Sequence, residues 1–308
     1  MLDLHRLRIL YELQRLGTVT AVAESLRYTH SAISQQLAQC EKDVGVALYE
    51  KAGRRVRLTE QGEILASYAE RMLALADEAE SQVIASTNAV RGTIKVTTFQ
   101  TIMSSLVPRA LTELAREYPD LRVQIIQREA DGAMELLARR EVDLILGEEY
   151  ESDMPATDEH THRELLLDDP LRLITPLTGP WSELRLEDFA AHDEEIPFAM
   201  DPEEFLLGRF VHRLCRRHGF NPSVLYETPD PFLHAHLVRT GHAVAVISDL
   251  FLDEIEGVRV VSLPGNPTRT LYTAVRAGRE GHPALRAFRA ALSKAAATAK
   301  DFGPLPAV

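Results

Sequence analysis

TVTAVAESLRYTHSAISQQLAQC, the stretch from Thr18 to Cys40, decides the first part of the fold. Apolar residues recur at helical spacing on both sides of the polar sequence 27–30, which predicts two helices joined by a short turn. In the second helix Ile33, Leu37 and Cys40 share one face, whereas hydroxyl and amide side chains lie on the other. This pattern is typical of a helix-turn-helix, and hydroxyls and amides are groups that reach base edges in the major groove of DNA.

A further helix is predicted before this stretch. Apolar residues at three- to four-residue spacing extend from Leu4 to about Leu16, and Gly17 is suited to end the helix in a left-handed conformation. Either Thr18 or Thr20 can cap the helix that follows.

A basic hairpin is predicted after the second half of the helix-turn-helix. Residues 48–59 indicate two short strands around Gly53, with Arg54 and Arg55 in the turn between them. Arginines in such a wing can contact phosphates or enter a narrow minor groove. The N-terminal part therefore has the pattern of a winged helix-turn-helix.

This part of the sequence resembles the DNA-binding domain of the LysR-type transcriptional regulators over about 60 residues. The stretches that carry the resemblance, in the family's order and spacing, are 7–10, 18–26, 31–37, 41–49 and 54–62. The chain departs from the family in Ser31, usually proline, which bears on base preference, and in Cys40, usually leucine, which bears on core packing. The DNA contacts predicted from the helix face, the wing and the resemblance are Thr29, His30, Ser31, Ser34, Gln35, Gln39, Arg54 and Arg55.

A long helix is predicted over residues 60–88, with Thr59 as its cap. Its apolar residues approximate a heptad spacing: Leu65, Tyr68, Met72, Leu75, Ala79 and Val83. This stripe can pack within its own subunit or against the same helix of a second chain. The resemblance implies the second alternative, and with it a homodimer or homotetramer.

The remainder of the chain has the alternation of an α/β fold. Strands are predicted at 93–98, 121–126 and 142–147, with helices from Leu106 to Tyr118 and from Met134 to Arg140. This βαβαβ order indicates a parallel, doubly wound sheet.

The same region resembles the two-lobed effector domain of the LysR-type regulators, which is similar to periplasmic binding proteins. The domains expected are a winged helix-turn-helix at 1–59, a linker and dimerisation helix at 60–91, and an effector-binding domain at 92–308. Within the last, lobe I is expected at 92–162 and 268–308, and lobe II at 163–267. The fold class is therefore α/β with an N-terminal all-α winged helix-turn-helix.

A small-molecule site is expected where strands of the α/β domain end, because open α/β sheets bind ligands at the carboxyl ends of their strands. Hydroxyl, amide and backbone N–H groups at a helix N-terminus suit an anion. Mixed charges around them would suit a zwitterion. The predicted effector contacts are Thr98, Phe99, Gln100, Thr101, Arg128, Asp131, Asp201 and Phe232.

The charge of the chain is divided unevenly. The whole sequence of 308 residues carries a net charge of -12, which by itself argues against binding to nucleic acid. Residues 1–62, however, hold nine lysines and arginines against seven aspartates and glutamates, a net charge of +2. The acidity lies mainly in residues 93–308, so a DNA-binding surface is expected only in the N-terminal part.

Composition and motifs limit the other classes of function. The sequence shows no signal peptide and no run of about 20 apolar residues, so the chain is expected in the cytoplasm without a membrane partner. Its two cysteines make no disulfide framework. No nucleophile elbow, P-loop or dinucleotide fingerprint occurs, so no enzyme and no cofactor is expected. The alternative is an enzyme or solute-binding protein of the two-lobed α/β class with an accessory helical N-terminus.

Histidines gather at 160 and 162 and at 234, 236 and 242. Neither spacing matches a standard zinc pattern. The sequence therefore predicts solvated or hinge histidines rather than metal ligands.

Overall fold

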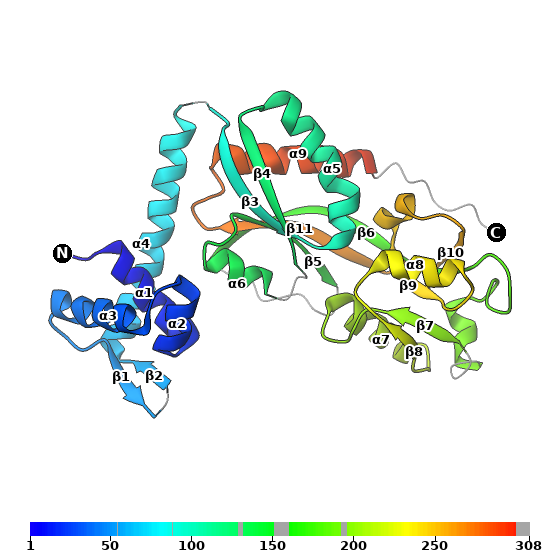
Figure 1. Cartoon of the computed structure of the whole chain (residues 1–308), viewed down its shortest axis with the longest axis horizontal. Helices are drawn as coiled ribbons and strands as arrows, with labels where there is room; N and C mark the ends of the chain where they lie inside the picture. The colour runs from blue at the N-terminus through cyan, green and yellow to red at the C-terminus, as the bar shows by residue number, and fades with distance from the viewer. Residues whose placement is uncertain (54, 88, 129–131, 151–159, 192–195, 300–308) are drawn as a thin grey trace. The chain divides into compact units, whose positions relative to one another are not determined.

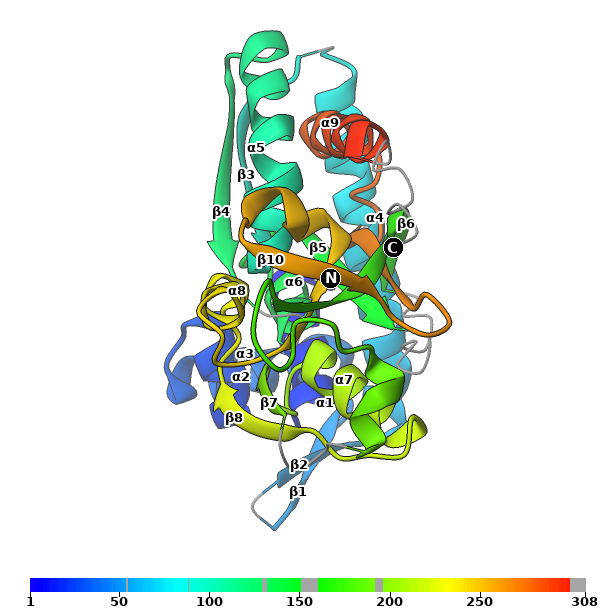
Figure 2. The same cartoon turned by 90° about the vertical axis from the view of Figure 1, so that its right-hand side faces the viewer.

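The computed structural model describes residues 1–53, 55–87, 89–128, 132–150, 160–191 and 196–299. Contacts divide the chain into two compact units. The first comprises Met1–Asn88 together with Arg276–His282, and the second comprises Ala89–Val275 and Pro283–Val308. Figure 1 colours the elements from blue to red along the chain, and Figure 2 gives the perpendicular view.

Three helices form the body of the first unit: α1 (Leu4–Leu16), α2 (Val19–Leu26) and α3 (His30–Val44). Each begins at a side chain that accepts a hydrogen bond from a backbone amide of the first turn, namely Asp3, Thr18 and Thr29. Of the two threonines considered from the sequence, Thr18 is therefore the cap of α2. Gly17 and Gly45 end α1 and α3 at positive φ, as expected where an L side chain would be strained.

The apolar face of α3 packs into one core with α1, α2 and the hairpin. Ile33, Leu37 and Cys40 are buried there, as the sequence predicted. The hairpin consists of β1 (Tyr49–Ala52) and β2 (Arg55–Leu58), which pair antiparallel. The amide of Val56 also donates a 2.9 Å hydrogen bond to the carbonyl of Gly17, which fixes β2 against the end of α1.

The long helix α4 (Glu60–Ala85) spans 26 residues and begins at the cap Thr59. It ends before residue 88, the end predicted from the sequence. Its buried positions carry small or polar side chains, whereas several of its large apolar side chains are exposed. The buried residues of α4 are Gly62, Ala66, Ala69, Asp77 and Ser81. The predicted stripe is open in part: Tyr68, Leu75 and Val83 are at least half exposed, whereas Met72 is half-buried and Leu65 packs against the core of the winged helix.

The second unit is built on a seven-stranded sheet in the order β10-β6-β11-β5-β3-β4, with β9 also pairing with β6. The strands are β3 (Gly92–Thr98), β4 (Leu121–Gln127), β5 (Leu144–Tyr150), β6 (Thr161–Pro176), β9 (Ala245–Ser248), β10 (Val258–Ser262) and β11 (Thr268–Arg276). β3 is parallel to β4 and β5, as predicted. That prediction rested on these three strands alone, and the sheet as a whole is mixed, because β11 pairs antiparallel with β5, and β9 and β10 pair antiparallel with β6. Antiparallel neighbours need no crossover helix, and β6 and β11 each run long and unbroken.

Helices cover both faces of the sheet around β3 and β5. α5 (Gln100–Glu117) and α9 (Pro283–Ala299) pack together on one face, and α6 (Ala133–Ala138) packs on the other (Figure 1). Alternate residues of β5 serve the two layers: Leu144 and Leu146 join α5 and α9, and Ile145 joins α6. This is the two-residue period of a strand buried on both faces.

The remaining elements form a second core around the far half of β6. They are η1 (Leu186–Ala191), β7 (Pro197–Met200), α7 (Leu206–Arg217), β8 (Ser223–Glu227), α8 (Pro231–Arg239) and η2 (Asp249–Glu254). β7 and β8 pair in parallel as a separate two-stranded sheet. Leu171 and Leu173 of β6 pack toward α7, and Ile174 packs toward α8.

The structure corrects two predicted boundaries that bear on the small-molecule site. α5 begins at Gln100 rather than at Leu106, because Phe99 is already the cap residue and the polar first turn is helical. β5 runs from Leu144 to Tyr150 rather than from 142 to 147, which brings Glu148 and Tyr150 into the sheet.

Candidate nucleic-acid interface and small-molecule site

The polar face of α3 lies where the sequence predicted it. Thr29, His30, Ser31 and Gln35 are exposed, and Ser34 is half-buried beside them. The hydroxyl of Thr29 accepts from the amide of Ala32 at 3.2 Å and lies 3.1 Å from the Ser31 hydroxyl. The first turn of α3 thus presents hydroxyl, imidazole and amide groups to solvent, on a helix held by the core behind it.

Gln39 differs from the other predicted contacts because its amide is engaged within the unit. Its Nε2 donates to Oδ1 of Asp43 at 3.0 Å, and Asp43 also forms an ion pair with Arg6. The bond from Gln39 and the charge and hydrogen bond of Arg6 hold the pKa of Asp43 below its usual value. Gln39 therefore joins a polar cluster between α1 and α3.

The wing, which follows α3 along the chain, carries exposed cations. Arg55 and Arg57 are both exposed on β2, and they share a strand face because they are two residues apart. Arg54 lies outside the described residues. Arg57 was missed from the sequence, although the alternation of RVRL at 55–58 was enough to place it with Arg55.

The predicted small-molecule site centres on the junction of β3 and α5. Thr98 ends β3, is 1% exposed, and has a hydroxyl with no hydrogen-bond partner among the described residues. Phe99 follows at the N-cap position of α5. Its side chain makes no hydrogen bond to the first turn of the helix, and its ring is buried in the core. The Nε2 of Gln100 donates to Oδ1 of Asp230 at 3.1 Å, which links the start of α5 to the start of α8.

The other predicted effector contacts differ in how near they lie to this junction. Arg128 is exposed, and its amide donates to the carbonyl of Thr98 at 2.9 Å, so it lies beside the junction. Asp201 lies 3.9 Å from the ring nitrogen Nδ1 of His234. Phe232 is partly exposed in the first turn of α8 and packs edge-on against Phe251. Asp131 lies outside the described residues.

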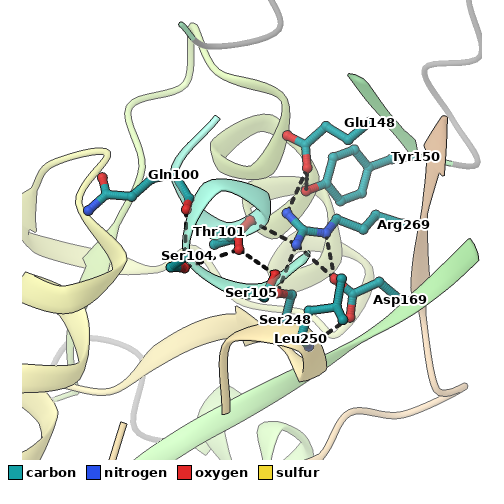
Figure 3. A network of polar contacts seen from close by, with 10 residues as sticks. All are labelled: Gln100, Thr101, Ser104, Ser105, Glu148, Tyr150, Asp169, Ser248, Leu250 and Arg269. Atoms are coloured by element: carbon teal, nitrogen blue, oxygen red, sulfur yellow. Dashed lines mark hydrogen bonds and ion pairs between the residues drawn. The ribbon is translucent and has the colours of Figure 1, made fainter. Parts of the chain in front are cut away.

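Sequence reasoning missed a buried cation near this junction, the guanidinium of Arg269 on β11. Its Nε donates to Oδ2 of Asp169 at 2.9 Å, and its Nη1 donates to Oε2 of Glu148 at 2.8 Å. Its Nη2 donates to the hydroxyls of Thr101 at 2.9 Å and Ser248 at 2.8 Å. We call these five residues the Arg269 network; Figure 3 shows the guanidinium between the two carboxylates and pointing toward Thr101.

The network joins parts of the second unit that are far apart in sequence. Thr101 belongs to α5, Glu148 to β5, Asp169 to β6, and Ser248 to the end of β9. Asp169 additionally accepts from the amide of Leu250 at 3.1 Å. The sequence signal for the Arg269 network was the presence of charged residues inside otherwise apolar strands.

Burial dominates the electrostatics of this network. Desolvation raises the pKa of Glu148 above its usual value, although the charge and hydrogen bond of Arg269 oppose the shift. Burial alone would lower the pKa of Arg269, but the carboxylates of Asp169 and Glu148 raise it, so the guanidinium stays charged. Burial and the neighbouring Glu148 raise the pKa of Tyr150, whose hydroxyl donates to Glu148 at 3.2 Å.

Histidines and cysteines are the remaining residues that the sequence singled out for metal or redox chemistry. No group of three or more potential metal ligands occurs in the described ranges. His234 is buried rather than solvated: its Nε2 lies 2.7 Å from the carbonyl of Thr228, and burial lowers its pKa. Cys40 and Cys215 are both free and buried, and burial raises the pKa of the Cys215 thiol to about 12.

The fold combines a winged helix-turn-helix with an α/β domain built on a mixed sheet. Family models agree with this class: residues 4–63 match the bacterial regulatory helix-turn-helix protein, lysR family, and residues 87–297 match the LysR substrate binding domain. The chain belongs to the LysR family and is a DNA-binding transcriptional regulator with an effector-binding domain.

Individual relatives are distant but span most of the chain. The transcriptional dual regulator GltC of Bacillus subtilis is 25% identical over 264 residues, which cover 85% of this chain and 86% of GltC. The solved structure of a full-length OxyR variant from Pseudomonas aeruginosa has a TM-score of 0.63 at 21% identity and covers 96% of this chain and 95% of that one. Full-length CbnR in complex with its target DNA has a TM-score of 0.51 at 18% identity, with 96% and 100% covered. These two structural similarities concern the fold alone.

No helix in the described part of the chain has both the length and the apolar character needed to span a bilayer.

Proposed function

We propose that the exposed face of α3 reads base edges in an interrupted palindrome, while Arg55 and the rest of the wing contact the DNA backbone or minor groove. The observation that carries this proposal is the set of exposed hydroxyl and amide groups on the first turns of α3. A helix of this kind is suited to the major groove, and two copies on a dimer would occupy two half-sites. We place this regulator in the cytoplasm and assign it no catalytic activity.

A gel-shift titration with fragments of neighbouring promoters tests the proposal. Specific fragments should be bound more tightly than random DNA of the same length at physiological salt. Equal affinity for both would contradict sequence reading by α3.

Two substitutions should separate base reading from phosphate contact. Gln35→Ala should weaken specific binding by about 1–3 kcal/mol and relax preference at one base position, because an amide that reads a base edge is lost. Arg55→Ala should instead weaken binding about equally for all sequences. It should also reduce the slope of the logarithm of the binding constant against the logarithm of the salt concentration by about 1. Affinities measured for a panel of single-base variants at several salt concentrations distinguish the two.

Matched controls come from the second unit. Gln124→Ala removes an exposed amide from β4, and Arg116→Ala removes an exposed charge from α5. Both should bind DNA as the wild type does. If Gln35→Ala left the base preference unchanged, the assignment of the recognition face would be wrong.

We further propose that a small anionic or zwitterionic effector binds at the junction of β3 and α5. The uncapped first turn of α5 offers backbone N–H groups, and the buried hydroxyl of Thr98 has no partner in the described residues. A carboxylate there would accept both kinds of hydrogen bond. Binding would shift the population of quaternary states and so change how the DNA is held.

Thr98→Val should abolish the thermal shift that small carboxylic acids give with the wild-type chain, since it removes one donor and keeps the side-chain shape. A panel of such acids, screened by melting temperature, provides the measurement. The control Thr112→Val changes an exposed threonine of α5 whose hydroxyl donates to the carbonyl of Pro108 in its own helix. A ligand that shifts the wild type and Thr98→Val equally would contradict this site.

We also propose that α4 forms the dimer interface. Three large side chains of its predicted stripe are exposed, Tyr68 at 50%, Leu75 at 64% and Val83 at 68%. Exposed apolar side chains at this spacing suit a second copy of the same helix.

A further inference from the structure

The strand β11 links the Arg269 network to the first unit of the chain. It begins at Thr268, carries Arg269, and ends at Arg276, where the chain enters the segment 276–282 that belongs to the first unit. We propose that Arg269 is a positioning residue that couples the hydroxyl of Thr101 through β11 to the linker helix α4. The regulatory meaning of this coupling rests on the effector site proposed above.

At the start of β11, all three nitrogens of the Arg269 guanidinium donate hydrogen bonds. The guanidinium, with its side chain 3% exposed, bonds both Asp169 and Glu148, and its Nη2 serves Thr101 and Ser248 together. A ligand that accepts a hydrogen bond from the hydroxyl of Thr101 therefore shares this hydroxyl with Arg269, and drawing the hydroxyl toward the ligand changes the bond that Arg269 donates to it. Because the guanidinium cannot turn away without leaving two buried carboxylates unpaired, the displacement is expected to involve the backbone of β11.

The strand is suited to pass such a displacement along its length. It pairs with β5 continuously from Arg269 opposite Tyr150 to Ala274 opposite Ile145. Its residues pack into layers on both faces, with Leu271 and Val275 on one and Tyr272 and Ala274 on the other. A strand held in this way moves as a whole, because a slip in register would turn every side chain to the wrong face.

The far end of the strand leads into a segment that is docked on α4. The Nε of Arg276 lies 3.4 Å from Oδ2 of Asp77, and the hydroxyl of Ser81 donates to the carbonyl of Gly278 at 3.0 Å. Asp77 and Ser81 are almost completely buried. Polar side chains buried on a linker helix need partners, and segment 276–282 supplies them.

Gly278 shows how close this docking is. It has a φ of +86°, and a Cβ atom at this position would lie 2.2 Å from the carbonyl oxygen of Ala74. The backbone of the segment therefore touches the backbone of α4. At its other end α4 is equally close to the winged helix, where a Cβ on Gly62 would lie 1.9 Å from the carbonyl oxygen of Leu48.

Hydrogen–deuterium exchange of the full-length chain, without any effector, tests the coupling. Thr101→Val removes the hydroxyl that accepts from Arg269. It should raise exchange in α4 peptides around 74–81 by about two- to thirtyfold, the range seen when residues along a coupled path are changed. Thr112→Val on the same helix should leave these peptides unchanged. Unchanged exchange in Thr101→Val, or a rise spread equally over α2 and α3, would overturn the proposal.

A second pair of variants examines the docked segment itself. Gly278→Ala should raise exchange at 74–81, and adding Thr101→Val to it should give no further rise there, because the connection is already broken. Gly281→Ala is the matched control, since a Cβ at Gly281 meets no atom within 4 Å. Additive effects of Gly278→Ala and Thr101→Val would overturn the path through this segment. DNA binding and effector binding are measured separately, so failure here is distinguishable from failure of the proposed effector site.

Discussion

Arg269→Met should lower the free energy of unfolding of the second unit by about 3–5 kcal/mol, because it leaves two buried carboxylates without their cation. Methionine keeps most of the side-chain volume, so the loss reports on charge pairing more than on packing. Urea unfolding followed by tryptophan fluorescence measures it directly. The single tryptophan of the chain, Trp181, packs against the core around η1, β7 and α7, and so reports on this unit.

The control for this variant is Arg109→Met. Arg109 pairs with Asp253 at 3.6 Å, and both side chains are 48% exposed. An exposed pair of this kind contributes about 0–1 kcal/mol. Equal losses in the two variants would show that the Arg269 network is not the source of the stability.

The dependence on pH gives this prediction a second signature. Arg269 lowers the pKa of Glu148, which burial raises, so removing the guanidinium should raise that pKa further. A carboxyl group whose pKa is higher in the folded chain stabilises the fold below its unfolded pKa and loses that contribution as pH rises through its folded pKa. The deficit of Arg269→Met should therefore shrink as the pH falls from about 8 to about 5. A deficit that stays constant or grows on acidification would contradict this account.

Leu75→Glu should convert the proposed dimer to monomers and weaken DNA binding by about 10²- to 10⁴-fold. Leu75 lies at the centre of the exposed stripe of α4, and a carboxylate there would be buried beside its own copy if two α4 helices pack together. The loss of affinity follows because two half-sites bound by one dimer reinforce each other. Sedimentation and gel-shift titrations give the two readouts.

Ser67→Glu provides the matched control, since it places the same charge on α4 at an exposed position away from the stripe. It should remain dimeric and bind DNA as the wild type does. If Leu75→Glu remained dimeric, the dimer interface would have to lie elsewhere on the chain.

The first unit was largely predictable from the sequence because its signals are local. The caps Thr18 and Thr29, the terminating Gly17 and Gly45, and the buried face of α3 all act within a few residues. Helical period and capping chemistry are enough to place such features. The exposed polar face of α3 followed from the same period.

The Arg269 network was not predictable because it depends on pairing between distant strands. Arg269 and Glu148 are separated by 121 residues and Arg269 and Asp169 by 100, and no local pattern specifies which strands become neighbours. The mixed direction of the sheet was missed for the same reason. The start of α5 was placed too late because its first turn is polar, so the apolar period used to find helices begins only at Leu106.

Segment 276–282 has a consequence for the construction of hybrid regulators. The first unit consists of two pieces of chain, and the shorter one lies between β11 and α9, close to the C-terminal end of the sequence. A hybrid joined only near residue 88 would bring a foreign loop against Ala74, Asp77 and Ser81. A hybrid that takes its DNA-binding unit from this chain should therefore carry both pieces of that unit. The linker helix α4 then keeps the loop that packs against it.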